Sequence, residues 1–219
     1  MVQNYVVLEH DKLKTNLELS ALKVAHAEAE NLLLRQQVHP HFLFNALGTL
    51  KALYRQNQKA GDTYVIHLAN FLRASVSNHT NKIARLDEEL QLLQDYMEMQ
   101  KIRFGTALTC SIAVPEESLK AYYLPAFSLQ PLLENAIKHN ELTEEMPLQV
   151  MVSQQEDRMV ISNNLQRKRS KEPSTGNGLA NLTERYRLLS GDPVIIEQKE
   201  DLFSVSLKLL PNEYSHNRR

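Results

Sequence analysis

A histidine that directly follows a proline lies in a short apolar stretch near the N-terminus and could serve as a nucleophile. The stretch reads Gln37-Val38-His39-Pro40-His41-Phe42-Leu43-Phe44-Asn45. In a helix His41 and Asn45 share a face, so the Asn45 amide could hydrogen-bond one ring nitrogen and set the tautomer. An imidazole whose other nitrogen is free can attack a phosphoryl group. A histidine on an apolar helix is more often packed or simply exposed, so this stretch alone leaves both interpretations open.

His39 is the competing nucleophile. It lies two positions from His41 and therefore points to roughly the opposite face of a helix. The same geometry argues against a metal site built from both histidines. Pro40 removes a backbone donor and crowds the carbonyl of Gln36, so we expect a helix kink at this point.

A second group of polar side chains interrupts an apolar helix between Leu129 and Asn140. The expected apolar stripe consists of Leu129, Leu132, Leu133, Ala136 and Ile137. The polar edge consists of Glu134, Asn135, Lys138 and His139. Asn135 can offer an oxygen to Mg²⁺, and Lys138, nearly one turn on, can reach a phosphate. The alternative is an ordinary solvated helix edge.

A third candidate is the small-residue segment Ser174-Thr175-Gly176-Asn177-Gly178-Leu179, which directly precedes an expected helix. Small residues allow close backbone approach, and amides at a helix N-terminus favour phosphate. An ordinary loop entering a helix explains the segment equally well. The basic residues before it could attract a triphosphate or could simply be solvated; they are Arg167, Lys168, Arg169 and Lys171.

Composition narrows the class of protein. The 219 residues are 42% hydrophobic and 23% charged, as in ordinary globular domains, and the net charge of -1 favours neither nucleic acid nor an anionic membrane. We therefore expect no nucleic-acid partner. Cys110 is the only cysteine, which excludes an internal disulfide and a Cys-rich zinc site and suits a reducing compartment. No stretch approaches the roughly 20 apolar residues of a membrane span.

The first half of the sequence predicts helices throughout. Residues 8–34 form the first, and its Leu22, Ala25, Ala29 and Leu32 have coiled-coil spacing, which fits either a dimer seam or packing on the same chain. Gly61-Asp62 predicts a helix break with an N-cap. The next helix should bury Val65, Leu68, Ala69, Leu72 and Val76. A capping Asp87 should start a further helix that reaches about Arg103. Residues 1–104 are thus expected to form an antiparallel helical hairpin with a pairing partner.

The second half predicts alternating helices and strands. Strands are indicated at residues 108–114, 148–152, 159–161, 194–196 and 203–209. Pro125 is expected to open the helix that carries the polar edge, and Gly191 to cap a helix over residues 179–189. The polar loop over residues 162–177 separates the two. This pattern indicates an α/β sandwich with helices on one face of a largely antiparallel sheet, beginning at residues 104–107.

Together these stretches resemble the LytS-type sensor histidine kinases. The Gln37–Asn45 stretch fits that family's phosphoacceptor box, and residues 86–104, including Glu89, Tyr96 and Arg103, fit its second signature. Residues 132–139 fit the N box. Residues 176–182, with Arg185 and Tyr186, fit the glycine box and its helix. The resemblance covers about residues 34–210.

The resemblance implies a role for each candidate. His41 is the phosphoacceptor, and Asn135 is the Mg²⁺ ligand. Lys138 and His139 lie near the phosphates of ATP. Gly176 and Gly178 let the lid backbone approach the nucleotide, with Asn177 and Leu179 in the same box. Glu134 stands where related ATPases carry a water-activating base, and here it could instead help deprotonate the attacking imidazole.

One box departs from the family pattern. Where D-x-G-x-G is expected after a strand, the chain reads Ile161-Ser162-Asn163-Asn164-Leu165. The Asn163 carbonyl oxygen can still accept a hydrogen bond from the adenine amine, but without the charge the bond is weaker by about 1 kcal/mol. Leu165 replaces a glycine and so opposes close backbone approach.

These observations predict an α+β protein with two domains. Residues 1–104 would form a dimerising phosphoacceptor hairpin, a four-helix bundle in the dimer, and residues 105–219 a sandwich that binds ATP and Mg²⁺. The expected partners are a second copy and a response regulator of the LytTR type. The expected location is the cytoplasm, with the full-length protein anchored in the inner membrane through a segment outside this chain. The rivals are a catalytically weak signalling scaffold of the same fold and an ATPase without phosphohistidine.

Overall fold

The computed structural model describes residues 40–77, 82–166, 168 and 177–212. The chain forms two compact units, residues 1–47 and 48–219, which are described separately. The expected first helix with its coiled-coil seam, the basic residues other than Lys168, and Gly176 lie outside the described residues. Pro40 is the first described residue, so the expected kink lies outside them as well.

Two helices follow, α2 (Pro40–Gln56) and α3 (Gln58–Ser77). The expected break at Gly61-Asp62 is wrong, because the chain breaks at Asn57, whose Oδ1 accepts a hydrogen bond from Ala60 N at 3.1 Å. Asparagine is a strong N-cap residue. Gly61 instead lies inside α3, where an added Cβ would come within 3.1 Å of Cγ in the Tyr54 ring. The glycine therefore serves close packing between α2 and α3.

The buried face of α3 differs from the expected one. It consists of Tyr64, Leu68, Phe71 and Ser75, whereas Val65 is 36% exposed and Ala69 is exposed as well. Leu68 alone was predicted correctly among these. Phe71 contacts Tyr96 of the next helix with 5.8 Å between ring centroids. The aromatic residues therefore set the rotation of α3 about its axis.

Helix α4 (Leu86–Phe104) follows a short strand, β1 (Ile83–Arg85). The expectation of helix throughout the first half is thus wrong at β1. Asp87 lies inside the first turn rather than at the cap, and Glu88 accepts the Arg85 N–H at 3.0 Å. Gly105, with φ of 58°, ends α4 before the short 3-10 turn η2 (Gly105–Ala107).

A small sheet in the order β1-β3-β8 lies at the start of α4. Its other strands are β3 (Tyr122–Pro125), which follows helix α5 (Glu116–Ala121), and β8 (Leu210–Pro211). Pro125 therefore ends a strand and does not open a helix. Ile83, Tyr123 and Leu210 form a buried cluster across the three strands. The sequence pattern missed this sheet because each strand is very short.

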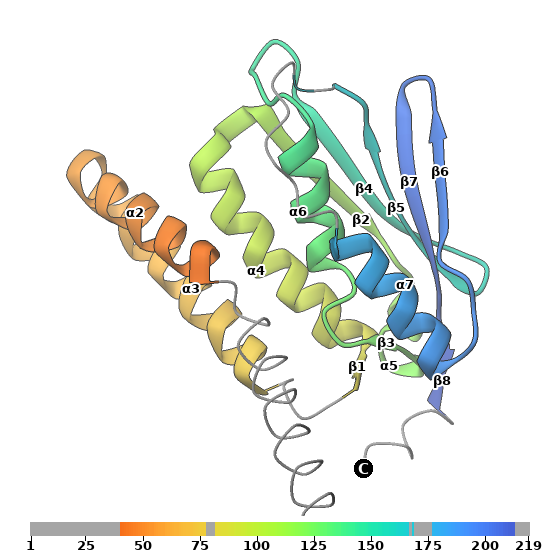
Figure 1. Ribbon diagram of the computed structural model, residues 1–219. Helices are drawn as coiled ribbons and strands as arrows, with labels where there is room; N and C mark the ends of the chain where they lie inside the picture. The colour runs from red at the N-terminus through yellow and green to blue at the C-terminus, as the bar shows by residue number, and fades with distance from the viewer. Residues whose placement is uncertain (1–39, 78–81, 167, 169–176, 213–219) are drawn as a thin grey trace, which may run out of the picture. The chain divides into compact units, whose positions relative to one another are not determined.

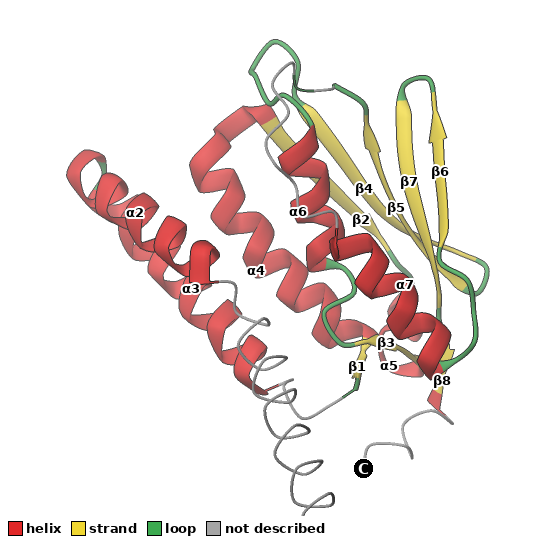
Figure 2. Ribbon diagram, viewed as in Figure 1, coloured by secondary structure: helices red, strands yellow, loops and turns green. Residues whose placement is uncertain are grey.

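The main sheet has the order β2-β4-β5-β7-β6. Its strands are β2 (Leu108–Ala113), β4 (Leu148–Gln155), β5 (Arg158–Asn164), β6 (Ile195–Lys199) and β7 (Leu202–Lys208). Only the β2–β4 pair is parallel. Helices α4, α6 (Gln130–His139) and α7 (Asn177–Leu189) lie along one face (Figures 1 and 2). The expected fold class, helices on one face of a largely antiparallel sheet, is confirmed.

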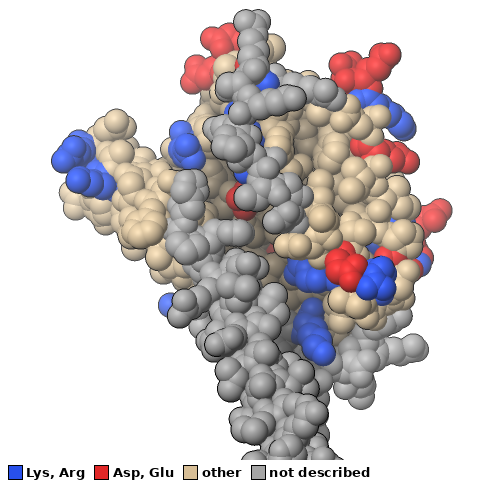
Figure 3. Space-filling view, viewed as in Figure 1, with Lys and Arg blue, Asp and Glu red and all other residues tan. Residues whose placement is uncertain are grey.

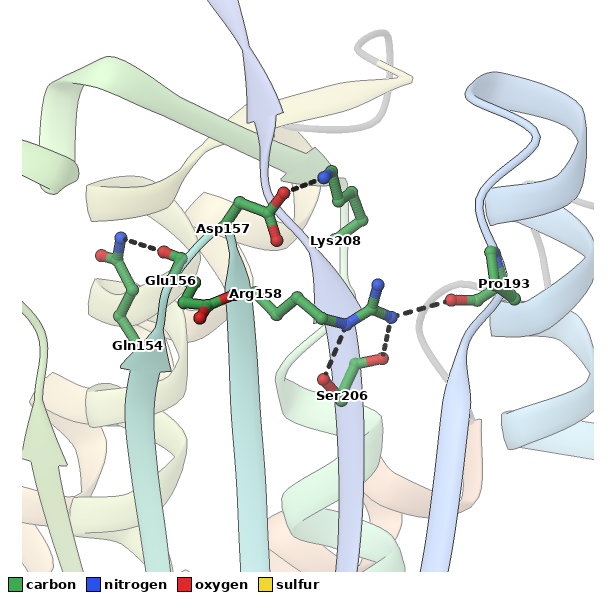
Figure 4. A network of polar contacts seen from close by, with 7 residues as sticks. All are labelled: Gln154, Glu156, Asp157, Arg158, Pro193, Ser206 and Lys208. Atoms are coloured by element: carbon green, nitrogen blue, oxygen red, sulfur yellow. Dashed lines mark hydrogen bonds and ion pairs between the residues drawn. The ribbon is translucent and has the colours of Figure 1, made fainter.

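Arg158 joins three successive backbone segments at one end of this sheet (Figure 4). Its guanidinium donates to Ser206 Oγ at 2.8 Å and to the carbonyls of Ser206 and Pro193, each at 2.9 Å. Next to it, Lys208 forms an ion pair with Asp157. These contacts fix the segment before β6 against β7. The edge strand β6 is therefore held by side-chain contacts as well as by its backbone hydrogen bonds to β7.

On the right of the view in Figure 3, acidic and basic side chains are interspersed. This agrees with the balanced composition. Among the described residues, no helix combines the length and the apolar character needed to cross a bilayer.

Candidate functional site

Helix α6 holds the polar edge by burying its other side. Leu132, Leu133, Ala136 and Ile137 are buried, as the stripe predicted. Glu134, Asn135 and Lys138 are half-buried and His139 is exposed. Glu134 Oε2 accepts a hydrogen bond from Gln130 Nε2 at 3.0 Å. The helix thus presents an acid, an amide and an amine along one partly accessible edge.

The end of β5 places Asn163 beneath the helical layer. The buried residues of β5 are Met159, Ile161 and Asn163, so the Asn163 side chain faces the helices and is only 4% exposed. Its Nδ2 donates to Asn164 O at 2.7 Å. Leu165 N donates to Asp201 O at 3.0 Å, so this amide is already used within the fold. A buried amide at the expected adenine position fits hydrogen bonding to a base.

The segment after Asn163 runs beside the C-terminal end of α6. Gln166 N donates to Asn140 Oδ1 at 2.7 Å, and Glu141 N donates to Gln166 O at 2.6 Å. Lys168 N donates to His139 O at 3.3 Å. These bonds join the C-terminal end of α6 to the segment that follows Asn163, although the two are well separated in the sequence.

Helix α7 supplies the third group. It begins at Asn177, packs beside α6, and ends before Gly191, whose φ is 77° (Figure 1). Gly178 is exposed, and a Cβ there would meet nothing within 4 Å. Leu179 is half-buried. Asn177, Gly178 and Leu179 therefore lie in the first turn of α7, which begins two residues earlier than expected, and there is open space at Gly178.

His41 lies in the first turn of α2, and Asn45 follows one turn later in the same helix. Asn45 is exposed, and so is the neighbouring Phe44, at 74%. The helical geometry assumed for His41 and Asn45 is confirmed. A role for either residue stays a prediction.

Two charged residues, buried Glu89 and half-buried Arg185, join the helices of this site in a way that the sequence did not reveal. Glu89 of α4 accepts hydrogen bonds from backbone amides just before α6, and Arg185 of α7 donates to carbonyls of the same loop. Both residues lie in stretches that resemble the family boxes. Their mutual placement depends on three separate elements, so no local pattern could show it.

A pocket of about 400 Å³ lies elsewhere, where α3, α4 and β2 meet. His67 Nδ1 lies 2.9 Å from Asp95 Oδ1 at its rim, and Cys110 lines it from β2. None of the predicted site residues lines this pocket. It is therefore separate from the α6–β5–α7 site.

The donor set at α6 suits a cation carried by phosphates. Within the described ranges, no three His, Cys, Asp or Glu side chains come together as a metal site. Mg²⁺ commonly binds through one or two protein oxygens together with substrate phosphates and water. Asn135, half-buried beside Lys138, fits that pattern as a single oxygen ligand.

Comparison with known proteins agrees with these observations. A family profile described as "Histidine kinase" matches residues 29–108. The sensor histidine kinase BtsS of Escherichia coli K12 is 37% identical over 131 residues, 60% of this chain and 21% of BtsS. The sensor protein LytS of Staphylococcus saprophyticus is 31% identical over 128 residues, 55% of this chain and 22% of LytS. The matched part of the chain is therefore similar to sensor histidine kinases of the LytS type.

The match spans only about a fifth of these LytS-type relatives' own length, 21% of BtsS and 22% of LytS. Solved structures are more distant. A histidine kinase AdeS from Acinetobacter baumannii is 13% identical with a TM-score of 0.40, covering 80% of this chain and 96% of that one. A bacterial phosphotransferase is 13% identical with a TM-score of 0.49, covering 83% and 97%.

Proposed function

We propose that this chain is the transmitter region of a sensor histidine kinase. It would transfer the γ-phosphoryl group of Mg-ATP to His41 and then to an aspartate of a response regulator. The observation that carries the proposal is that α6, the segment after β5 and α7 come together at one edge of the helical layer. That edge offers a buried amide for adenine, an amine for phosphate and a helix N-terminus for anionic oxygens.

Phosphoryl transfer depends mainly on a nucleophile placed in line with the leaving group and on stabilisation of the negative charge of the phosphates. An imidazole nitrogen of His41 attacks the γ-phosphorus, the bond from that phosphorus to the bridging oxygen breaks, and ADP leaves. Lys138 offsets negative charge on the phosphates, and His139 lies near them. Asn135 supplies an oxygen to Mg²⁺, which when bound neutralises phosphate charge. Gly176 and Gly178 would let the backbone approach the nucleotide, with Asn177 and Leu179 in the same box.

The nitrogen–phosphorus bond requires that the attacking imidazole end without its proton. We assign proton removal to Glu134, because its carboxylate lies on the same edge of α6 as Asn135 and is only half-buried. Gln130 already donates to one of its oxygens, which holds the side chain along the helix. Glu134→Gln is expected to slow phosphohistidine formation about 100-fold at neutral pH, within the range for general bases. An unchanged rate in single-turnover labelling would remove this assignment.

The proposed partners rest on the same similarity to sensor histidine kinases. We propose a homodimer in which the helices of residues 1–104 pair into a four-helix bundle, followed by the nucleotide domain at residues 105–219. Exposed apolar side chains on α3, Val65 at 36% and Ile66 at 60%, support a further helix contact there. The response regulator is proposed to be of the LytTR type, and the full-length protein to be held at the inner membrane.

Labelling with γ-labelled ATP and Mg²⁺ tests the function. A kinase should acquire label that is stable in alkali and lost in acid. Nucleotide binding and phosphate release without label would identify an ATPase, and absence of nucleotide binding would favour the scaffold. The scaffold has one observation in its favour, since the Leu165 amide is occupied by Asp201 O.

We expect a substitution at Asn163 to increase the affinity for ATP. Its side chain is almost buried beneath the helices, where a carboxylate would accept a stronger, charge-assisted hydrogen bond from the adenine amine. Asn163→Asp is therefore expected to tighten ATP binding about fivefold to tenfold, corresponding to about 1 kcal/mol. The neighbouring Asn164→Asp is not a suitable control, because Asn164 Nδ2 donates to Pro147 O at 3.1 Å and a carboxylate cannot replace this donor.

The control for Asn163→Asp is Gln198→Glu, which adds the same charge on the exposed strand β6. Titration of each variant with ATP and with GTP separates adenine recognition from general charge effects. Weaker ATP binding in Asn163→Asp would contradict an adenine-facing role for this position.

A further inference from the structure

The start of α6 is capped by a residue from another helix. Glu89 of α4 is fully buried, and its carboxylate accepts the N–H groups of Phe127, Ser128 and Leu129 at 2.6, 2.8 and 3.2 Å. Leu129 is the N-cap residue of α6. The first amides of a helix lack partners within it, and its positive end favours an anion. Glu89 thus satisfies both needs from a distance of about forty residues in sequence.

Arg185 of α7 holds the other side of the same loop. Its guanidinium donates to the carbonyl of Phe127 at 3.0 Å and to that of Ala126. Burial raises the pKa of Glu89 and lowers the pKa of Arg185, and each charge opposes the shift of the other. The buried Glu89 carboxylate and the half-buried Arg185 guanidinium therefore hold one loop from two helices.

The loop between them adopts a conformation that needs such support. Phe127 has φ of 60°, in the left-handed region that bulky residues rarely adopt. Ser128, fully buried, donates from Oγ to Pro125 O at 2.5 Å. Strained residues persist where their surroundings over-determine them, often near functional sites.

The consequence for the site is geometrical. Lys138 lies nine residues beyond Leu129, so it is about 13 Å along the helix from the cap, at 1.5 Å per residue. A tilt of about 10° at the capped end would move it by about 2 Å. Misplacement of reacting groups by about 1 Å can cost about 100-fold in rate. The orientation of α6 therefore matters at the phosphates.

We propose that Glu89 and Arg185 are positioning residues that fix the Ala126–Leu129 loop between α4 and α7 and thereby set where Asn135 and Lys138 lie relative to the start of α7. The proposal rests on the proposed kinase function. Because α4 also packs against α3 through Phe71 and Tyr96, a displacement of α4 would be passed to α6 through the Glu89 carboxylate.

The key variant is Glu89→Gln. It keeps the shape, but one oxygen becomes an amide nitrogen, so it can accept from Phe127 N or from the Ser128 and Leu129 amides, and not from both. Its control is Glu98→Gln, a half-buried acid on the same helix paired with Lys101. The second variant is Arg185→Lys, which keeps the charge and loses the two-pronged geometry. Its control is Arg187→Lys, exposed on α7 and paired with Glu184.

All four variants and the wild type are compared by thermal unfolding, by amide hydrogen exchange at residues 127–129, and by the rate of phosphohistidine formation over a range of Mg-ATP. We expect Glu89→Gln and Arg185→Lys to remain folded and to lose at least tenfold in rate at saturating Mg-ATP, with faster exchange at the loop. Both controls should behave as the wild type.

Lower melting temperatures with wild-type rates per folded molecule would overturn the proposal, because the contacts would then only stabilise the fold. If Glu89→Gln does not fold, the rate of Arg185→Lys decides. If the wild type takes up no label, both the proposed kinase function and this inference are contradicted. Normal rates in both variants beside a labelled wild type would remove the inference alone.

Discussion

His41→Ala is expected to abolish the acid-labile label, whereas His39→Ala is expected to retain it. Alanine has no nitrogen that could form the phosphoramidate bond, so the loss should be complete within detection. His41 lies in the first turn of α2, directly after Pro40, with Asn45 one turn further on. His39 would project to roughly the opposite side of a helix. The pair therefore provides a test within a single tripeptide.

The measurement is labelling with γ-labelled ATP, followed by parallel acid and alkali treatment of the protein. Nucleotide affinity serves as the control, because neither substitution lies in α6, β5 or α7. Label that persists in His41→Ala would contradict the assignment, and so would label lost from His39→Ala alone. Equal loss in both variants with weakened nucleotide binding would indicate a folding defect and would call for Asn45→Ala in its place.

Asn135→Ala is expected to give the second large effect. It removes the one amide oxygen that α6 offers beside Lys138, and no metal-binding group of His, Cys, Asp or Glu exists among the described residues to replace it. We expect phosphohistidine formation to fall about 100-fold or more, as when a group that stabilises transition-state charge is removed. The Mg²⁺ concentration for half-maximal rate should rise as well.

The rate should be measured against Mg²⁺ concentration at constant ATP. Asn135→Asp keeps an oxygen ligand and should retain most of the metal dependence, while Gln149→Ala, exposed on β4, should match the wild type. An unchanged Mg²⁺ requirement in Asn135→Ala would show that this residue is not the metal ligand. The buried neighbours Ala136 and Ile137 keep the helix in place in every variant.

Local patterns determined much of this protein. Apolar spacing located α6 and the strands of the main sheet because burial on one face imposes a period on the sequence. Gly191 marked the end of α7 because its φ of 77° suits glycine. The order and spacing of the family boxes, from His41 to Gly178, indicated the class of protein.

Contacts between side chains of different elements determine where α3 begins and which of its faces is buried. The break between α2 and α3 lies at Asn57, because an amide that caps a helix outweighs a glycine that packs against Tyr54. The buried face of α3 follows Tyr64 and Phe71 and leaves Val65 outside. Both interpretations of residues 57–71 were locally reasonable, and only contacts across elements distinguish them.

Glu89 illustrates the limit most clearly. In sequence it is an acid in the first turn of α4, where a solvated residue interacting with the helix dipole is the ordinary expectation. In the structure it is buried and caps α6, beside Arg185 from a third helix. A carboxylate can stabilise the start of its own helix or of another one, and the sequence around it is compatible with both. Tertiary packing decides between them because it determines which unpaired amides lie within hydrogen-bond distance.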